Sequence, residues 1–500
     1  MYSHSTLVRC IPLLGYLTVF LLAAVTISLK YEAAKEHKLA YEKYEVYVTS
    51  AYYYNRSKSL GDASVALILV ADFEFVESIE KINIIGENST GTVIQTAQLH
   101  SIPPHKVCRW VPIFVTTPLL HNLKHLSVDL GISRVQIPFQ LAITKKHNVV
   151  TCIAPLFANE NWQLALISIH TYKHYGSHLH IYIRSMISPL FDLLRIYEKE
   201  GFITIDPWLR IKLSTISQKR FNPNLNVEFR NQAGAQTDCL LKYKESADFI
   251  SFMDLDDILI PRLGSNYFEE FTSLFNSAPY ASFIHYVKEN VEVDAQKYAQ
   301  DFNLYQMLSS IRYSQQTETG KMVTKPEYIN YTWIHWPDNG LMPNYKVPSD
   351  INSITHLKKI NLGMFSENGG TVELPYYEPS SGYRLYPTHL LEEKDRLTIE
   401  QEFQRIKNLT IDMNIFEELP PTFFYSPLIA DCYERTFYSL HNQGLHYRMK
   451  CPGPERCYFP ESPGLECQNA ESIYSSADGE LYNIHYHQRD HFELEDGCSR

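Results

Sequence analysis

The chain has 500 residues, of which 45% are hydrophobic and 13% aromatic, a composition that excludes a disordered protein and suffices for two or three packed domains. The formal net charge of -11 excludes the broad basic face that a nucleic-acid-binding protein needs. The sequence therefore predicts a folded protein that does not bind nucleic acid.

The N-terminus carries the uncharged stretch CIPLLGYLTVFLLAAVTISL, residues 10–29, bounded by Arg9 and Lys30. As a helix with a rise of about 1.5 Å per residue, this stretch covers the roughly 30 Å of a bilayer core. A cleavable signal peptide, the alternative, usually has a shorter apolar region of about 7–15 residues. We therefore expect a transmembrane signal anchor at residues 10–29, after a cytoplasmic tail of residues 1–9.

Eight cysteines follow this stretch, several of them clustered in CPGPERCYFPESPGLEC. An even number predicts disulfides in an oxidising compartment, and the spacings differ from the paired C-x2-C of zinc sites. Four sequons, at Asn55, Asn88, Asn330 and Asn408, permit N-glycosylation. Together these features predict a membrane glycoprotein of the secretory pathway, with a short cytoplasmic tail and a luminal folded part.

The pattern of the chain changes twice after the anchor. Residues 30–60 are charged and rich in tyrosine, and we interpret them as a stem. Residues 61–150 contain short, partly alternating apolar runs separated by Gly and Pro, which predicts a small β-rich region. Residues 411–500 form a cysteine-containing C-terminal region to which the sequence assigns no fold.

Between these regions, strand-like and helix-like segments alternate. This alternation predicts right-handed crossover units on a mostly parallel sheet, an α/β domain whose ligands bind at the carboxyl ends of the strands. The predicted strands are residues 151–157, 178–186, 202–208 and 248–257, and the predicted helices are residues 161–176, 188–201 and 229–247.

The fourth predicted strand ends in the acidic sequence DLDD. Asp254 and Asp256 are two residues apart and point to the same side of an extended segment. Two carboxylates there suit Mg²⁺ or Mn²⁺, which could neutralise a leaving diphosphate, whereas we expect Asp257 to orient its neighbours. The plainer interpretation is a solvated acidic turn.

Several motifs, in this order, resemble glycosyltransferase family 92 over roughly residues 50–400. They are SAYYYNR, CIAPLF, a Trp in the next helix, HLHIY, a helix containing DCL, and DLDD. The resemblance implies a GT-A (Rossmann-like) catalytic domain over residues 151–410 in a type II Golgi membrane protein. Such enzymes transfer galactose from UDP-galactose to glycans, with inversion and with Mn²⁺.

The resemblance also implies roles for individual residues. Asp254 and Asp256 would contact the metal and the UDP-sugar, and His356 would be a third metal ligand, although Leu357 and Lys358 replace the Tyr and Arg usual after it. Residues 152–157 would line the uridine pocket. The remaining implied contacts are Pro155, Phe157, Gln232 and Asp238 for the donor nucleotide, and Lys325 and His335 for donor or acceptor.

The segment YTWIHWPDNG suggests an acceptor site. Trp333 and Trp336 could stack on a sugar ring, although tryptophan more often packs in a core. Inversion needs a base that deprotonates the acceptor hydroxyl. The sequence does not choose among Asp338, Glu327 and Glu318; we take Asp338 as the working hypothesis and a turn before Asn-Gly as its plain alternative.

Two other classes of function remain. FISFMDLDDIL resembles the first motif of haloacid-dehalogenase-type phosphatases, in which Asp254 would be a nucleophile, but Ile258 stands where Thr or Val is usual. A non-catalytic carbohydrate-binding or adhesion ectodomain would share the cysteines and the tyrosine-rich surface. The motif order favours a metal-dependent inverting hexosyltransferase that uses a UDP-sugar and a glycan acceptor.

Overall fold

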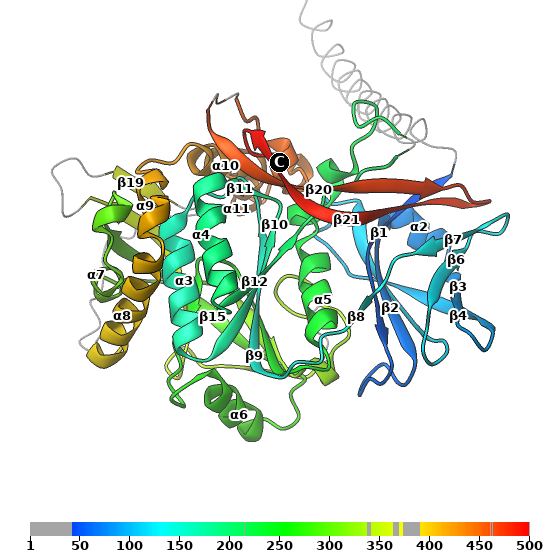
Figure 1. Ribbon diagram of the computed structural model, residues 1–500, viewed down its shortest axis with the longest axis horizontal. Helices are drawn as coiled ribbons and strands as arrows, with labels where there is room; N and C mark the ends of the chain where they lie inside the picture. The colour runs from blue at the N-terminus through cyan, green and yellow to red at the C-terminus, as the bar shows by residue number, and fades with distance from the viewer. Residues whose placement is uncertain are drawn as a thin grey trace, which may run out of the picture.

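The computed structural model describes residues 43–214, 216–337, 342–363, 370–373, 391–460, 462 and 464–499 (Figure 1). The predicted anchor at residues 10–29 and the base candidate Asp338 lie outside these ranges. Within them, none of the helices combines the length and the apolar character needed to cross a bilayer. The fold is mixed α/β, with two large sheets.

The apolar runs between residues 61 and 150 form strands, as predicted, because they are rich in Val, Ile and Leu. The described strands of this part join an 11-stranded sheet in the order β2-β5-β4-β3-β6-β7. Their bounds are β2 Ser64–Asp72, β3 Lys81–Glu87, β4 Thr92–Ser101, β5 Trp110–Pro118, β6 His125–Asp129, β7 Arg134–Ile137 and β8 Gln140–Leu141, with α2 at Phe73–Ser78.

The stem expected over residues 30–60 is wrong for β1, Tyr44–Tyr54, which pairs antiparallel with β2 inside this sheet. Its sequence YEVYVTSAYYY consists mainly of β-branched and aromatic residues, which favour a buried strand over a solvated stem. Two buried tyrosines of β1 also fix its position: the Tyr52 hydroxyl donates to Asp238 at 2.9 Å and the Tyr54 hydroxyl to the carbonyl of Leu241 at 2.7 Å.

The second sheet begins with four parallel strands in the order β12-β10-β9-β13, which confirms the predicted parallel core. Gly176 and Gly201, both with positive φ, end the first two helices, as predicted. The bounds are β9 His147–Leu156, α3 Trp162–His174, β10 Ser177–Ile183, α4 Ser188–Lys199, β12 Ile203–Pro207, α5 Gln232–Tyr243 and β13 Ala247–Met253.

Helices cover both faces of these parallel strands (Figure 1). Alternate residues of β9 explain this arrangement: Val149 and Ile153 pack in the cluster that contains α3 and α4, whereas Val150 and Cys152 pack with α5. The sheet is therefore buried on both faces, as a parallel sheet must be.

Beyond β13 the sheet continues in the order β13-β16-β15-β18-β14, in which β15 and β18 pair parallel and the other neighbours pair antiparallel. This extension matters for the site, because it brings Lys288 of β15, Lys321 of β16 and His356 of β18 to the turn that follows β13. The bounds are β14 Asp257–Leu259, β15 Phe283–Ala295, β16 Arg312–Thr324, β17 Asn344–Lys346, β18 Ile354–Leu362 and β19 Gly370–Glu373.

The remaining described helices flank this extension or follow it. They are α6 Tyr267–Ser277, α7 Leu304–Ser309, α8 Glu393–Leu409, α9 Ile415–Glu418, α10 Tyr425–Tyr433, a π-helical turn Glu434–Tyr438 and α11 Ser439–Asn442. Short 3₁₀ turns lie at Pro223–Asn226, Glu228–Arg230, Ala299–Asp301, Pro326–Tyr328, Ile411–Met413, His446–Arg448 and Pro454–Arg456.

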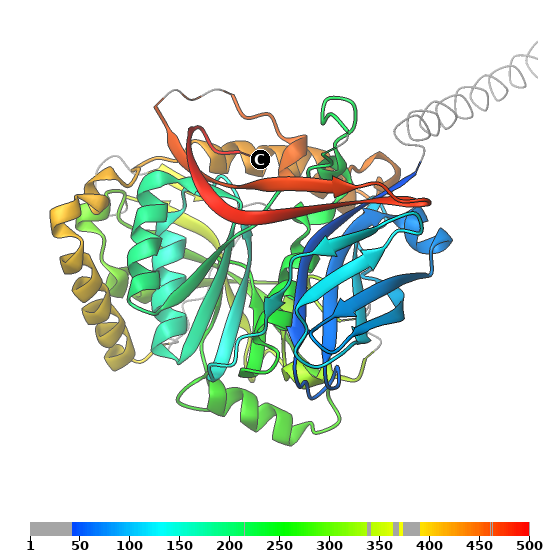
Figure 2. The ribbon, with the colours of Figure 1, turned by 45° about the vertical axis from the view of Figure 1, so that its right-hand side comes forward.

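The C-terminal region is not a separate unit. Its hairpin, β20 Glu466–Ala477 and β21 Tyr482–Asp496, pairs with β1 on one side and with β11, Ser185–Ile187, on the other. Figures 1 and 2 show this long red hairpin crossing from the N-terminal strands to the parallel sheet. The predicted disulfides are confirmed: the pairs are Cys108–Cys451, Cys152–Cys239, Cys432–Cys457 and Cys467–Cys498.

Candidate active site

The DLDD sequence forms a tight turn directly after β13. The Asp257 amide donates to the Asp254 carbonyl at 3.1 Å, and the Asp254 amide donates to the Asp257 carboxylate at 3.0 Å. Asp257 is fully buried, and burial raises the pKa of its carboxyl group. This carboxylate therefore holds the turn, while Asp254 and Asp256 are partly exposed.

Strand pairing brings His356 to this turn. Short β14, which begins at Asp257, runs antiparallel to β18, with Asp257 opposite His356. The His356 Nε2 lies 3.3 Å from Asp256 Oδ2, and its Nδ1 lies 2.8 Å from the Asn290 amide oxygen. Ligand atoms of Asp256, Asp257 and His356 lie within 4.8 Å of one another, as a divalent cation requires. Two carboxylates and one imidazole suit Mn²⁺ or Mg²⁺ chemically.

The residues after His356 depart from the pattern of the resembling family without disturbing this arrangement. Leu357 is buried in the core, and its amide donates to the carbonyl of Asp256 at 2.8 Å. Lys358 binds the carboxylate of Glu318 at 2.9 Å. Because His356 points to the opposite side of the strand from Leu357, the Tyr-to-Leu difference leaves it beside Asp256.

Asp254 faces nitrogen donors instead. Lys288 and Lys321 each place Nζ 3.0 Å from its Oδ2, and Gln232 donates to its Oδ1 at 3.0 Å. Burial alone would raise the pKa of Asp254, but the two ammonium groups outweigh it and hold the pKa well below its ordinary value. Among the described residues, the carboxylates and imidazole close enough together to hold a metal ion are those of Asp256, Asp257 and His356, whereas Asp254 pairs with the two lysines.

Glu318 lies on the far side of His356. Its carboxylate is 3.8 Å from His356 Nδ1, pairs with Lys358, and accepts a hydrogen bond from Asn290 at 2.8 Å. Burial raises the pKa of Glu318, but Lys358 and His356 more than offset that effect, so its pKa lies below the ordinary value. Of the three acids considered as the base, Glu318 is therefore the one that the described structure brings to the site.

The segment before α5 is strained and links the turn to the end of β9. Phe229, Arg230 and Asn231 have φ values of 39°, 58° and 62°, a left-handed run that non-glycine residues rarely adopt. The Arg230 guanidinium lies 3.4 Å from the centre of the Phe157 ring and donates to the carbonyl of Pro155 at 2.9 Å. Pro155, Phe157 and Gln232, predicted at the donor site, are thus joined through Arg230.

The C-terminal region contributes two tyrosines that sequence reasoning missed. The Tyr433 hydroxyl accepts a hydrogen bond from Arg230 at 3.1 Å. Burial raises the pKa of Tyr438, and the nearby negative charges of Asp254 and Glu318 raise it further, which places its hydroxyl among the site's charges. The sequence carries no spacing signal for this long-range approach; π-helical turns, however, are frequent at functional sites.

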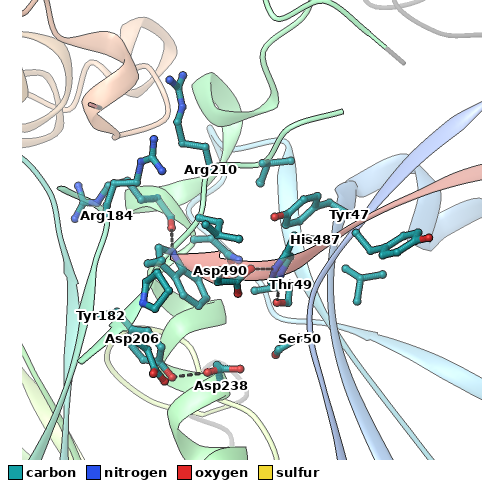
Figure 3. Close-up of a pocket in the computed structure, with 18 of the residues that line it drawn as sticks. Tyr47, Thr49, Ser50, Tyr182, Arg184, Asp206, Arg210, Asp238, His487 and Asp490 are labelled. Carbon is teal, nitrogen blue, oxygen red and sulfur yellow. Dashed lines mark hydrogen bonds and ion pairs between the residues drawn. The ribbon is translucent and has the colours of Figure 1, made fainter. Parts of the chain in front are cut away.

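Asp238 lies on α5 but away from the acidic turn. Six residues separate it from Gln232, and its carboxylate accepts hydrogen bonds from Tyr52 and Tyr182. It lines a cavity of about 400 Å³ where β10 and β12 end (Figure 3). Arg230 and Asn231 also line this cavity, so it reaches the residue next to Gln232. Other polar lining residues include Tyr47, Thr49, Arg184, Arg210, Glu455 and His487.

The segment around His335 lies against the lysine side of the turn. The His335 Nδ1 lies 2.8 Å from the carbonyl of Gly320, and burial lowers the pKa of this histidine to about 3, so the ring is neutral. The ring centres of Trp333 and Trp336 are 5.3 Å apart, and both residues are partly exposed. Trp333 also donates to the carboxylate of Glu228 at 2.7 Å.

Lys325 and Glu327 lie toward the other end of β13, which corrects the expectation for both. The strand β16 runs antiparallel to β13, and its last residue lies opposite the middle of β13, whereas Asp254 follows the carboxyl end. The Lys325 ammonium lies 5.2 Å from the centre of the Phe275 ring, and Glu327 pairs with Lys58 at 3.2 Å. Antiparallel geometry carries Lys325 and Glu327 away from the site, and the chain returns to it at Ile334 and His335.

The four sequons differ in how exposed their asparagines are. The side chains of Asn55 and Asn408 are exposed, whereas those of Asn88 and Asn330 are half-buried. Asn330 accepts a hydrogen bond from Ser59 at 3.2 Å, and Asn88 holds the amide of Thr90 at 2.7 Å.

Lys288 and Lys321 are the site residues that the sequence reasoning missed most plainly. Both are buried; Lys321 lies on β16, which pairs with β13, and Lys288 lies on β15, the next strand of the sheet. A lysine in a buried strand position needs a partner, and that requirement is the signal that could have found them.

Comparisons with known proteins agree with this geometry. The sequence profile described as "Glycosyltransferase family 92" matches residues 147–406. The chain is 42% identical over 457 residues to glycosyltransferase family 92 protein F13G3.3 of Caenorhabditis elegans, covering 91% of this chain and 90% of that protein. It is 34% identical over 466 residues to protein C33H5.2 of the same family and organism, covering 91% and 90%.

Among solved structures, S. aureus TarS residues 1–349 in complex with UDP aligns with a TM-score of 0.20 and 10% identity, covering 35% of this chain and 46% of that chain. A score this low carries no argument about function. The sequence relatives span nearly the whole chain, and the profile includes the acidic turn, His356 and both lysines. The chain therefore belongs to glycosyltransferase family 92 and is a glycosyltransferase.

Proposed function

We propose that this enzyme has a GT-A catalytic domain and transfers a hexose, galactose from UDP-galactose, to a glycan acceptor with inversion. One observation carries the proposal: Asp256 and His356 meet at the carboxyl end of β13, next to Asp254 and its two lysines. Ligands of parallel α/β sheets bind at this edge. The chemistry of the cluster suits a metal ion and a diphosphate, which fits a nucleotide-sugar donor better than the phosphatase alternative.

Asp256 and His356 would hold the cation, Mn²⁺ or Mg²⁺. Asp257 contributes less directly, because its two oxygens already contact the Asp254 amide and Lys288. When bound, the cation would supply positive charge that stabilises the leaving diphosphate. Burial raises the pKa of Asp256, but the His356 ring offsets this and the pKa lies below its ordinary value, so the carboxylate is ionised and available as a ligand.

We place the nucleoside of the donor beside Pro155, Phe157 and Arg230. The aromatic ring and guanidinium offer stacking and hydrogen bonding, and Arg230 also lines the cavity of about 400 Å³ in front of Asp238. That volume lies within the range of about 300–1,000 Å³ that small-molecule sites occupy. The donor would extend from this cavity across Gln232 to the acidic turn.

We assign the acceptor sugar, a fucose or galactose on a glycan, to the surface around Trp333 and Trp336. Their partly exposed rings can cover the apolar face of a pyranose. Glu318 is ionised at neutral pH and lies next to His356, so it is the base that the described geometry favours for removing the acceptor proton. Asp338, two residues beyond Trp336, is the second candidate.

We also propose that the enzyme is a single-pass type II protein with its catalytic part in the Golgi lumen. The uncharged residues 10–29 and the four disulfides support this location, since disulfides persist in oxidising compartments. Protease treatment of sealed microsomes tests it: the C-terminus should be digested only after detergent is added. Digestion without detergent would reverse the orientation.

The function is tested by UDP release from UDP-galactose with Mn²⁺ and a panel of glycans, using the full-length protein in detergent. Asp256→Asn should lower turnover by about 100-fold or more. The bound cation would be held less well, and the negative charge on the leaving diphosphate would lose several kcal/mol of stabilisation. Asp248→Asn is the matched control, since Asp248 is exposed near the opposite end of β13. EDTA should abolish turnover of the wild type.

Each other outcome corrects a defined part of the proposal. Normal turnover by Asp256→Asn would refute the metal site. Release from another UDP-sugar alone would replace galactose as the donor sugar. Normal turnover by Glu318→Gln, with loss in Asp338→Asn, would transfer the role of base to Asp338.

A further inference from the structure

Lys321 is built into the acidic turn in a way that a surface lysine is not. Its side chain is 2% exposed and its Nζ lies 3.0 Å from Asp254 Oδ2 and 3.2 Å from the carbonyl of Ile334. The neighbouring Gly320 is required for this placement, because a Cβ there would lie 1.5 Å from the carbonyl oxygen of Tyr286. Strands β15 and β16 thus approach closely where Lys321 enters the site.

The two lysines on Asp254 have different attachments. Lys288 touches two carboxylates, Asp254 at 3.0 Å and the fully buried Asp257 at 2.8 Å. Lys321 touches only one carboxylate among the described residues, and its second partner is a neutral carbonyl. Moving Lys321 to another anion therefore breaks one ion pair, whereas moving Lys288 breaks two. Lys288 holds the turn together, and Lys321 is the ammonium group that can turn to a ligand.

The charges around Lys321 indicate that, once a divalent cation is bound, such a ligand is anionic. Ion pairs form two groups of side chains, one around Lys288 and one around His356, and these groups meet at the turn, where ligand atoms of Asp256, Asp257 and His356 lie within 4.8 Å of one another. Together this network has four carboxylates and three ammonium groups, which leaves one negative charge if His356 is neutral. The carboxylates are Asp254, Asp256, Asp257 and Glu318, and the ammonium groups are Lys288, Lys321 and Lys358.

A divalent cation alone would make this partly buried network net positive, and a diphosphate alone would make it strongly negative. A diphosphate carries about two negative charges in a UDP-sugar, so the cation and the diphosphate together leave the net charge unchanged. Because uncompensated charge in a buried site is costly, each should bind more tightly when the other is present.

We propose that Lys321 binds the diphosphate of the donor and, through its charge, makes the binding of donor and divalent cation mutually dependent. The inference rests on the proposed UDP-sugar donor and adds a residue and a binding order to it. In the free enzyme Lys321 neutralises Asp254; in the donor complex its ammonium contacts a phosphate oxygen. Its carbonyl partner Ile334 belongs to the segment that carries Trp333 and Trp336, so the donor and acceptor sides meet at this lysine.

The test measures binding, not turnover. Mn²⁺ binding without nucleotide is followed by electron paramagnetic resonance, and UDP binding with and without Mn²⁺ by calorimetry, on the full-length protein. In Lys321→Met, UDP should bind about 10- to 100-fold more weakly at saturating Mn²⁺, the loss expected for one hydrogen-bonded ion pair. Mn²⁺ alone should bind more tightly, by about tenfold, because the network then carries one more negative charge.

Two variants make the result specific. Lys321→Arg keeps the charge and should retain UDP affinity within about threefold. Lys325→Met removes a lysine four residues farther along, at the other end of β13, and should change neither constant. If Lys321→Met does not fold, Lys321→Gln replaces it, because the amide can still donate to the Ile334 carbonyl.

Opposite shifts in the two affinities support the proposal, since a lysine that only held the turn would weaken both. Parallel losses of Mn²⁺ and UDP binding, or no change in either, would overturn it. If wild-type protein with Mn²⁺ binds no UDP at all, the proposed donor fails, and that failure is distinct from unchanged UDP affinity in Lys321→Met.

Discussion

The buried carboxyl group of Glu228 makes the stability of the enzyme depend on pH. It is 5% exposed, accepts hydrogen bonds from the His105 amide at 3.1 Å and from Trp333 at 2.7 Å, and begins the strained segment before α5. Burial raises the pKa of Glu228 to about 7, and the two hydrogen bonds offset only part of the shift. The perturbation is Glu228→Gln, which keeps an acceptor oxygen but cannot ionise.

The magnitude follows from the difference between the ordinary pKa of 4.5 and about 7 in the folded protein. Below pH 4.5 the carboxyl group is protonated in both states. Between the two values the unfolded chain loses the proton while the folded protein keeps it, so the free energy of unfolding falls as the pH rises. At about 1.36 kcal/mol per pH unit, the loss through this group amounts to about 3 kcal/mol and is complete above pH 7.

The assay is denaturant unfolding of the full-length protein at several values between pH 5 and pH 8. Between pH 5 and pH 8, the free energy of unfolding of Glu228→Gln should fall by about 3 kcal/mol less than that of the wild type. Glu80→Gln, at an exposed glutamate, should leave the pH profile unchanged. An identical slope in wild type and Glu228→Gln would refute the reasoning, because the carboxyl group would then be ionised in the folded protein at little cost.

Further predictions concern the links around the site. Cys239→Ser opens the disulfide that ties α5 to β9 across 87 residues. On the chain-entropy estimate this should lower the free energy of unfolding, measured by denaturation, by about 4.6 kcal/mol; a loss below about 1 kcal/mol would contradict this. Asp257→Ala leaves Lys288 with one carboxylate and should cost about 3 kcal/mol, seen as a lower denaturation midpoint, whereas normal stability would show that the turn does not need this group. Tyr433→Phe removes a partner of Arg230 and should raise the KM for the UDP-sugar about tenfold with kcat unchanged; an unchanged KM would separate Arg230 from the donor.

Local sequence patterns are enough to predict the parallel core and the position of the acidic turn. Alternation of apolar strands and capped helices is a local pattern, so residues 151–253 could be assigned with little error, and Asp254 and Asp256 follow directly from the end of the fourth strand. The even number of cysteines likewise predicted disulfides, although their pairing depends on the fold. The order of the motifs was enough to indicate the family, because each motif is a short stretch of neighbouring residues that can be recognised without knowing the tertiary structure.

Long-range pairing decided the rest. Periodicity does not show which strands lie side by side, so the approach of His356 to Asp256 and of Lys288 and Lys321 to Asp254 required the extension of the sheet beyond β13. The same limit explains the misplaced Lys325, whose distance from the turn depends only on the register of β16 against β13. It also explains why residues 44–54 were taken for a stem, since the partner strands of β1 lie near residue 68 and near residue 484. The sequence specifies the chemistry of each side chain. The distance between two charges that are a hundred residues apart, however, is set only when the backbone hydrogen bonds of the sheet form.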